Sequence, residues 1–256
     1  MNYTPYTDDF KIDTAIAGVL TCNGNFDSEI NSGADYHTIT WDEICEMAAR
    51  PACAEKKHAP AIIPSIYHAY DGRGHATQRQ RGQFILLTVD IDKGNPAEAE
   101  VIAAVHAVTG HQPLDLVVYS TSSATREDRK WRALVRLAQP IPGCDFSETQ
   151  EALFDLLEAH GIICDRKLAR TGQLVYLPNV PPNRRKADGK PEAYGCEIEH
   201  QDSTGDGPGL DLATTPIPAQ VEKRRVEREA AQGKAKAEAA ERAARRSSEE
   251  GGSTIE

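Results

Sequence analysis

The chain has 256 residues, with 29 Lys or Arg against 39 Asp or Glu, so its formal net charge is −10. This length is enough for one substantial core, or a core with an accessory segment. No run of the roughly 18 apolar residues that span a bilayer occurs, and the acidic N-terminus is unlike a secretory signal. The six cysteines lack zinc-ligand spacing, which indicates reduced thiols. The sequence therefore favours a cytoplasmic protein with no membrane partner.

The middle of the chain alternates between helical and strand patterns. Thr40, followed by Glu43, forms a capping box ahead of a helix. The later elements are a strand at 84–89, a helix opened by Asn95 and closed by Gly110, strands at 114–120 and 131–137, a helix opened by Ser147 and closed by Gly161, and a strand at 173–178. The order strand, helix, strand, strand, helix, strand predicts an α+β protein with a ferredoxin/RRM-like βαββαβ sheet core. Residues 1–80 are expected to add an N-terminal α/β layer.

Composition divides the chain into three parts. Residues 1–200 are expected to form the packed domain, and 201–220, rich in Gly, Pro, Thr and Asp, a linker. Residues 221–256 have high helix propensity but few large apolar side chains, which predicts a solvated helical tail. Its abrupt end indicates a domain cut from a longer polypeptide.

The predicted topology brings several polar residues to one end of the sheet. It places the third strand antiparallel to the first, and the fourth along the other edge of the first. The residues expected to meet there are Asp90 and Asp92, Ser120, Arg132, and the segment from Asp165 to Gln173.

Asp90 and Asp92 lie two residues apart, so an extended strand projects both carboxylates on one face. Such a pair is costly without a cation between the two acids, and oxygen ligands suit Mg²⁺ or Mn²⁺. Asp165 would add a third carboxylate, enough for two ions. The alternatives are a turn capped by the Asp-x-Asp pair, and a salt bridge from Asp165 to Arg166 or Lys167.

Residues of types that suit phosphate binding are expected at the same end of the predicted sheet. The loop after the second strand carries Ser120, Thr121, Ser122 and Ser123, whose hydroxyls and backbone N–H groups suit phosphate oxygens. An ordinary Ser/Thr-rich hairpin loop is the alternative. Arg132 begins the third strand, where it can pair with the carboxylates or with a phosphate. Residues 166–190 carry seven Lys or Arg against one Asp in an acidic background, a local patch that suits polyanions.

The segments LLTVDID, VVYSTSSATREDRKWRALVRLAQPI and GIICDRKLARTGQLVYLPNV resemble the catalytic core of the archaeo-eukaryotic primase (AEP) superfamily, specifically phage and plasmid primase-polymerase domains, over about residues 40–180. The resemblance implies that Asp90, Asp92 and Asp165 bind two metals and are catalytic. It implies nucleotide contacts from Ser120, Ser122, Ser123, Arg132, Arg170 and Gln173. The chain departs from the family where Ser122 stands in place of a histidine, and where Gln173 stands in place of a basic residue.

The expected function is that of a DNA primase-polymerase, which makes or extends primers by template-directed, two-metal nucleotidyl transfer with Mg²⁺ or Mn²⁺. Its expected partners are a DNA template, nucleoside triphosphates and a helicase domain or protein. The candidate DNA-binding residues are Lys56, Lys57, Arg73, Arg184 and Arg185, with Lys186 in the same basic turn. A two-metal nuclease and a non-catalytic nucleotide or single-strand binding module remain alternatives. A rolling-circle nicking enzyme is disfavoured because none of the eight histidines forms a His-x-His pair.

Overall fold

The structure is a computed structural model that describes residues 14, 17–23, 36–110, 114–183, 196–199 and 209–250. Its first half contains β1 (Val19–Asn23), β2 (His37–Ile39), α1 (Trp41–Ala49), β3 (Ala52–Cys53), η2 (Lys56–His58), β4 (Pro60–Ile63), α2 (His75–Arg81), β5 (Gln83–Ile91), α3 (Glu98–Val108) and β6 (Leu116–Ser120). The second half contains β7 (Trp131–Pro142), α4 (Gly143–Ala159), η3 (Arg166–Ala169), β8 (Val175–Tyr176), β9 (Asn179–Val180), β10 (Cys196–Glu199), η4 (Leu212–Thr214) and α5 (Ile217–Glu250).

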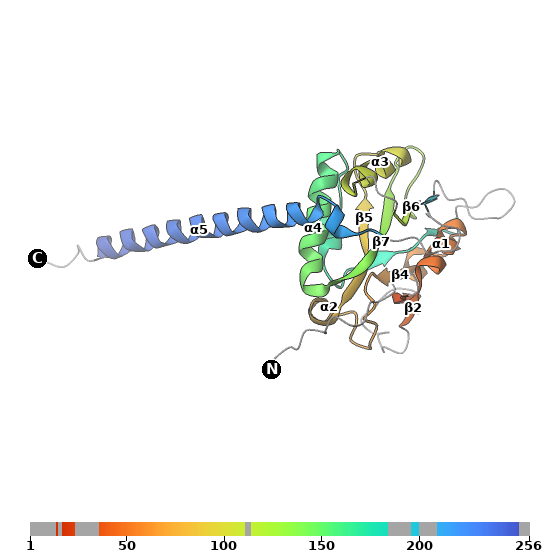
Figure 1. Ribbon diagram of the computed structural model, residues 1–256, viewed down its shortest axis with the longest axis horizontal. Helices are drawn as coiled ribbons and strands as arrows, with labels where there is room; N and C mark the ends of the chain where they lie inside the picture. The colour runs from red at the N-terminus through yellow and green to blue at the C-terminus, as the bar shows by residue number, and fades with distance from the viewer. Residues whose placement is uncertain are drawn as a thin grey trace, which may run out of the picture.

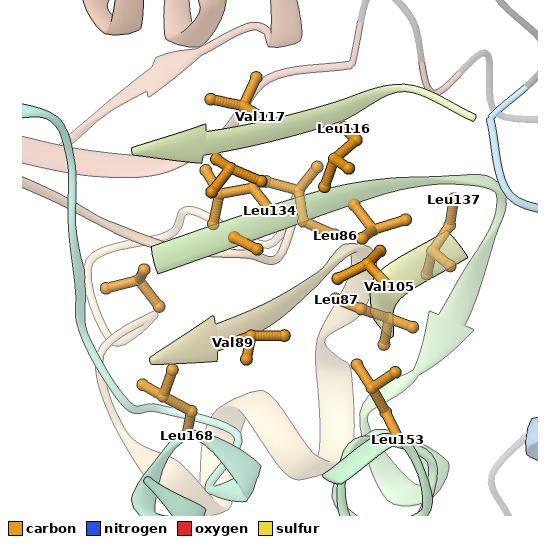
Figure 2. Close-up of a cluster of buried hydrophobic side chains, with 14 of the residues drawn as sticks. Leu86, Leu87, Val89, Val105, Leu116, Val117, Leu134, Leu137, Leu153 and Leu168 are labelled. Carbon is orange, nitrogen blue, oxygen red and sulfur yellow. The ribbon is translucent and has the colours of Figure 1, made fainter. Parts of the chain in front are cut away.

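The core is an antiparallel sheet in the order β10-β6-β7-β5, which lies between α4 and α1 in Figure 1. A second sheet has the order β2-β1-β4-β8, and β3 pairs with β9. Figure 2 shows apolar side chains of β5, β6 and β7 packed with residues from α3, α4 and η3. The apolar run of β5 is buried on both faces, as a strand covered by helices requires.

Several local predictions are confirmed. Thr40 and Glu43 form the expected capping box at the start of α1. Gly110 and Gly161 follow α3 and α4 with φ of 80° and 82°, the left-handed conformation that glycine adopts freely after a helix. The fold is a mixed α+β fold, and in its described part the N-terminal region supplies the added layer through β1, β2 and β4.

Two helices begin elsewhere than the sequence predicts. Helix α3 starts at Glu98 with Ala97 as its N-cap, and Asn95 lies before the helix with a positive φ of 51°. The side-chain oxygen of Asn95 instead accepts from the backbone N–H of Arg129 at 2.8 Å, which ties the loop after β6 to the end of β5. Helix α4 starts at Gly143 and not at Ser147.

The expected fourth strand of the core sheet lies in the other sheet. Residues Val175–Tyr176 form β8, which pairs with Ala61 and Ile62 of β4. Where the fourth strand was expected beside β5, the Asp165 N–H donates to the Asp90 carbonyl, and the chain then turns into η3. This turn leads the chain away from β5, and the strand that follows pairs with β4.

Helix α5 begins inside the segment expected to be a linker. Leu210 bridges to Leu137 of β7, and Leu210 and Ile217 are each only 1% exposed. The first turns of α5 lie against α4, while residues 226–243 are exposed, and Figure 1 shows the helix projecting away from the body. The described part of 201–228 is therefore packed on the domain. No described helix is both long and apolar enough to cross a bilayer.

Candidate functional site

A row of three side chains crosses the end of the core sheet. Asp90 of β5 lies opposite Arg132 of β7, and Arg132 lies opposite Tyr119 of β6. Residues opposite one another in adjacent strands project on the same face, so the three side chains are neighbours. The next row along the strands, which contains Ser120, faces the other side of the sheet.

Asp90 and Arg132 form an ion pair, with 2.6 Å between Oδ2 and Nη2. The two residues are only 9% and 8% exposed. Arg132 Nη1 and the Tyr119 hydroxyl each donate to the carbonyl of Tyr176 in β8, both at 2.7 Å. Burial disfavours the charged guanidinium and acts to lower the pKa of Arg132. The charge and hydrogen bond of Asp90, together with the contribution of Tyr119, outweigh burial and raise that pKa, so Arg132 stays protonated.

Each partner of this ion pair keeps one polar atom without a hydrogen bond. Within the described residues, Asp90 Oδ1 and Arg132 Nε are buried and have no partner. A buried polar atom without a partner costs free energy, roughly 1–3 kcal/mol, which a ligand at this place would recover. The carboxylate therefore has one oxygen available for a cation.

The row opens into a polar cavity of about 150 Å³. We call it the Asp90 pocket, and its lining residues are Lys56, Ala59, Asp90, Asp92, Tyr119, Thr121, Ser122, Ser123, Lys130, Arg132, Tyr176, Leu177 and Asn179. Carboxylates come from the end of β5, hydroxyls and Lys130 from the loop after β6, and Lys56 and Tyr176 from the second layer. Lys56 Nζ stands 5.4 Å from the centre of the Tyr176 ring.

The structure brings together part of the predicted site. The predicted residues that line the Asp90 pocket are Asp90, Asp92, Ser122, Ser123, Arg132 and Lys56. Ser120 lines a different cavity, of about 130 Å³, together with Trp131, Arg126 and Arg129. Ser120 is the last residue of β6 and faces away from Tyr119, whereas Ser122 lies in the following turn and lines the Asp90 pocket. The predicted grouping of Ser120 with Ser122 is therefore not what the structure shows.

The remaining predicted residues lie apart from the described lining of this pocket. Arg170 is exposed and Gln173 half-buried, in a segment that contacts the start of α2 where Gly172 donates to His75 Nδ1. Arg73 lies in the turn before α2, and Lys57 follows Lys56 in η2. Arg184, Arg185 and Lys186 fall outside the described residues.

Asp165 is a neighbour of Asp90 through the backbone, and its carboxylate is engaged locally. The Asp165 N–H donates to the Asp90 carbonyl at 2.8 Å, and its Oδ1 accepts from the Lys167 N–H at 3.0 Å as the N-cap of η3. Arg166 pairs with acids of α4, of which Glu158 Oε2 is 2.6 Å away. In the part of the chain that the structure describes, no three His, Cys, Asp or Glu side chains are arranged to hold a metal. A site with three carboxylates therefore stays a prediction.

The residues present fit a divalent cation held by two carboxylates. Asp90 offers the buried Oδ1, and Asp92 is exposed in the same pocket. Oxygen ligands of this kind suit Mg²⁺ and Mn²⁺. Lys130, Arg132 and the Ser122 hydroxyl supply positive charge and donors beside the carboxylates. This arrangement suits a ligand that combines a metal ion with a polyphosphate.

Four polar residues of the pocket, besides the apolar Ala59 and Leu177, were missed from the sequence. Lys130 stands two residues before Arg132 and shares its side of the strand, a spacing of two that identifies it in retrospect. Tyr119 follows from the same alternation on β6. Tyr176 and Asn179 reach the pocket from β8 and β9, and their position depends on how the two sheets meet, for which the sequence gives no local signal.

Comparison with known proteins gives one distant structural likeness. No family model matches the chain, and no curated protein matches it. The structure is similar to the AEP domain of the cyanophage S-2L primase-polymerase (PrimPol), with a TM-score of 0.39 and 11% sequence identity. The match covers 73% of this chain and 83% of the phage domain. At these values the likeness is remote, so the assignment of the site depends on its own geometry.

Proposed function

We propose that the chain is a DNA primase-polymerase, which joins nucleoside triphosphates on a DNA template with Mg²⁺ or Mn²⁺. One observation carries the proposal: Asp90, with a buried free oxygen, and Asp92 lie in the same pocket as Arg132, Lys130 and Ser122. Carboxylates for a metal beside donors for phosphates are what transfer of a nucleotide from a triphosphate needs.

The pocket residues divide into two groups by charge. Asp90 and Asp92 hold a divalent cation, and Asp165 is proposed as a third carboxylate, supported by its backbone bond to Asp90. Arg132, Lys130, Ser122 and Ser123 hold the phosphates by donating hydrogen bonds. When bound, divalent metal ions assist the attack of a 3′-hydroxyl and neutralise the leaving pyrophosphate.

The DNA template is proposed to approach from the second layer. Lys56 is exposed and lines the same pocket, and Lys57 is its neighbour in η2. Arg73, Arg184 and Arg185 stay candidates for contacts with the phosphate backbone, and a helicase stays a proposed partner. Salt-dependent affinity for single-stranded DNA is the expected consequence of such contacts.

Template-dependent synthesis tests the proposed function. The chain is incubated with single-stranded DNA, Mn²⁺ and all triphosphates, and labelled products are resolved by length. We expect products that depend on the template, and at least a roughly 100-fold loss for Asp90→Asn or Asp92→Asn, as for removal of a main electrostatic contribution to the transition state. Glu46→Gln, an exposed acid of α1, is the matched control and should retain activity. If only shortened DNA appears, the chain is a nuclease and the proposal fails.

A second candidate is a non-catalytic module that binds nucleotides or single strands. The observation that favours it is that Arg132 already neutralises Asp90, while the Asp165 carboxylate caps η3. Such a module would bind triphosphates equally well with and without Mg²⁺. It would also be insensitive to Asp90→Ala, and it would make no products.

A further inference from the structure

The buried ion pair between Asp90 and Arg132 stands where both proposed ligands would bind. Asp90 is proposed to hold the metal and Arg132 the phosphates, yet each is now the partner of the other at 2.6 Å. Both residues are about nine-tenths buried, where a charge is stable only when an opposite charge accompanies it. A ligand that takes one partner must therefore supply a replacement charge for the other.

A cation alone meets a poor site here. A divalent ion binds a carboxylate oxygen at about 2.1 Å. Bound to Asp90 Oδ1, it would lie close to the Arg132 guanidinium on Oδ2, two positive charges on one buried carboxylate. The repulsion falls only if an anion binds beside Arg132. Its Nε, buried and without a partner within the described residues, is a donor available to that anion.

An anion alone also meets a poor site, because it is repelled by the carboxylates of the pocket. A triphosphate that approaches Arg132 comes close to the carboxylate of Asp90, with Asp92 in the same pocket. When both ligands bind, the metal neutralises the carboxylates, the phosphates neutralise Arg132, and every buried charge keeps a partner.

We infer that the Asp90–Arg132 ion pair couples the two ligands, so that metal and triphosphate each bind weakly alone and strongly together. This inference rests on the proposed function for the identity of its ligands. Thermodynamic coupling is reciprocal, so each ligand raises the affinity of the other by the same factor, and coupling between sites commonly lies between about 5-fold and 150-fold.

The first arm of the test measures Mn²⁺ alone, by the electron paramagnetic resonance signal of the free ion. Arg132→Gln removes the competing cation from Asp90, and we expect its Mn²⁺ affinity to rise by about tenfold over the parent chain. Lys130→Gln is the matched control, because it removes one positive charge from the same pocket, and Lys130 pairs with Asp128 whereas Asp90 pairs with Arg132. An equal rise in Mn²⁺ affinity in the two variants would mean that any lost positive charge in the pocket has the same effect, which would overturn the inference.

The second arm measures inorganic tripolyphosphate in EDTA by calorimetry. Asp90→Asn releases Arg132, so we expect tripolyphosphate affinity to rise by about tenfold. Asp92→Asn removes the same charge from the pocket but leaves the ion pair, so its rise should be smaller. If Asp90→Asn binds no more tightly than Asp92→Asn, the inference is wrong. This arm also decides the question if Arg132→Gln does not fold.

The two arms contain no template and no reaction, so they fail independently of the proposed function. Coupling without DNA synthesis would leave the inference standing and exclude the polymerase. DNA synthesis without the expected contrast between the matched variants would support the polymerase and overturn the inference.

Discussion

The backbone N–H of Asp165 donates to the carbonyl of Asp90 at 2.8 Å, so two acids 75 positions apart in the sequence are joined directly at the end of β5. Their side chains have different partners. Asp90 Oδ2 pairs with Arg132, and Asp165 Oδ1 accepts from the Lys167 N–H at the start of η3. Asp165 therefore has a structural role in addition to its proposed catalytic one.

Asn and Ala substitutions separate the two roles of Asp165. Asp165→Asn keeps a side-chain oxygen for the N-cap but loses the charge, so we expect unchanged thermal stability and a large loss of DNA synthesis. Asp165→Ala should lose synthesis and also about 1 kcal/mol of stability, the usual cost of an N-cap. Calorimetric unfolding and the primer assay give the two readouts. Full activity of the Asn variant would show that Asp165 is only a cap.

Strand β6 ends at Ser120 and Ser122 lies in the turn after it, so the two serines are expected to have different roles. Ser122 lines the Asp90 pocket, whereas Ser120 lines the cavity beside Trp131. Ser122→Ala should weaken triphosphate binding in Mg²⁺ by about fivefold, the loss of one hydrogen bond of roughly 1 kcal/mol. Ser120→Ala is the matched control and should bind normally. Calorimetric titration measures both, and equal effects would contradict the assignment of the two serines to different cavities.

Features set by a few neighbouring residues were predictable from the sequence. The α1 capping box depends on two side chains three positions apart, and the apolar run of β5 depends on its own composition. The cluster of Asp90, Asp92 and Arg132 followed from strand order together with the alternation of side chains. These signals are short-range or follow from one topological rule.

Features that depend on partners distant in sequence were not predictable. The pattern of β8 is that of a strand, but its pairing with β4 is decided by the turn that Asp165 caps. Beyond the buried Ile217 and the partly buried Val221, the docking of α5 depends on acids of α4 that accept hydrogen bonds from Arg224 and Arg225. From the sequence alone, the row of acids on α4 predicts a solvated surface. The structure shows that arginines of α5 pair with these acids.

Acid pH is expected to detach α5 from α4. Hydrogen bonds from Arg228 and Arg225 lower the pKa of Glu148. Burial acts to raise the pKa of Asp155, but hydrogen bonds from Arg224, Arg166 and Gln220 outweigh it and lower the pKa. Because both folded pKa values are depressed, the docking contribution is present above the undocked values of about 4 and lost as pH falls through the folded ones.

Amide NMR resonances of residues 217–228, followed from pH 7 to pH 2, measure this loss. Glu148→Gln should weaken docking already at neutral pH, because Glu148 pairs with both Arg225 and Arg228. Glu238→Gln, in the exposed part of α5, is the matched control and should not. Resonances that do not change down to pH 2 would show that apolar contacts such as that of Ile217 hold the helix.

The cysteine beside Asp165 is expected to be unreactive in the folded protein. Burial, assisted by the nearby charge of Glu158, raises the pKa of the Cys164 thiol to about 12. At pH 7.5 almost none of it is thiolate, the form that alkylating reagents attack, whereas Cys144 is exposed. Iodoacetamide labelling followed by mass spectrometry should therefore modify Cys144 well before Cys164, and modify both in urea. Because Cys164 directly precedes the N-cap of η3, equal labelling rates without urea would mean that the junction holding Asp165 against Asp90 opens readily.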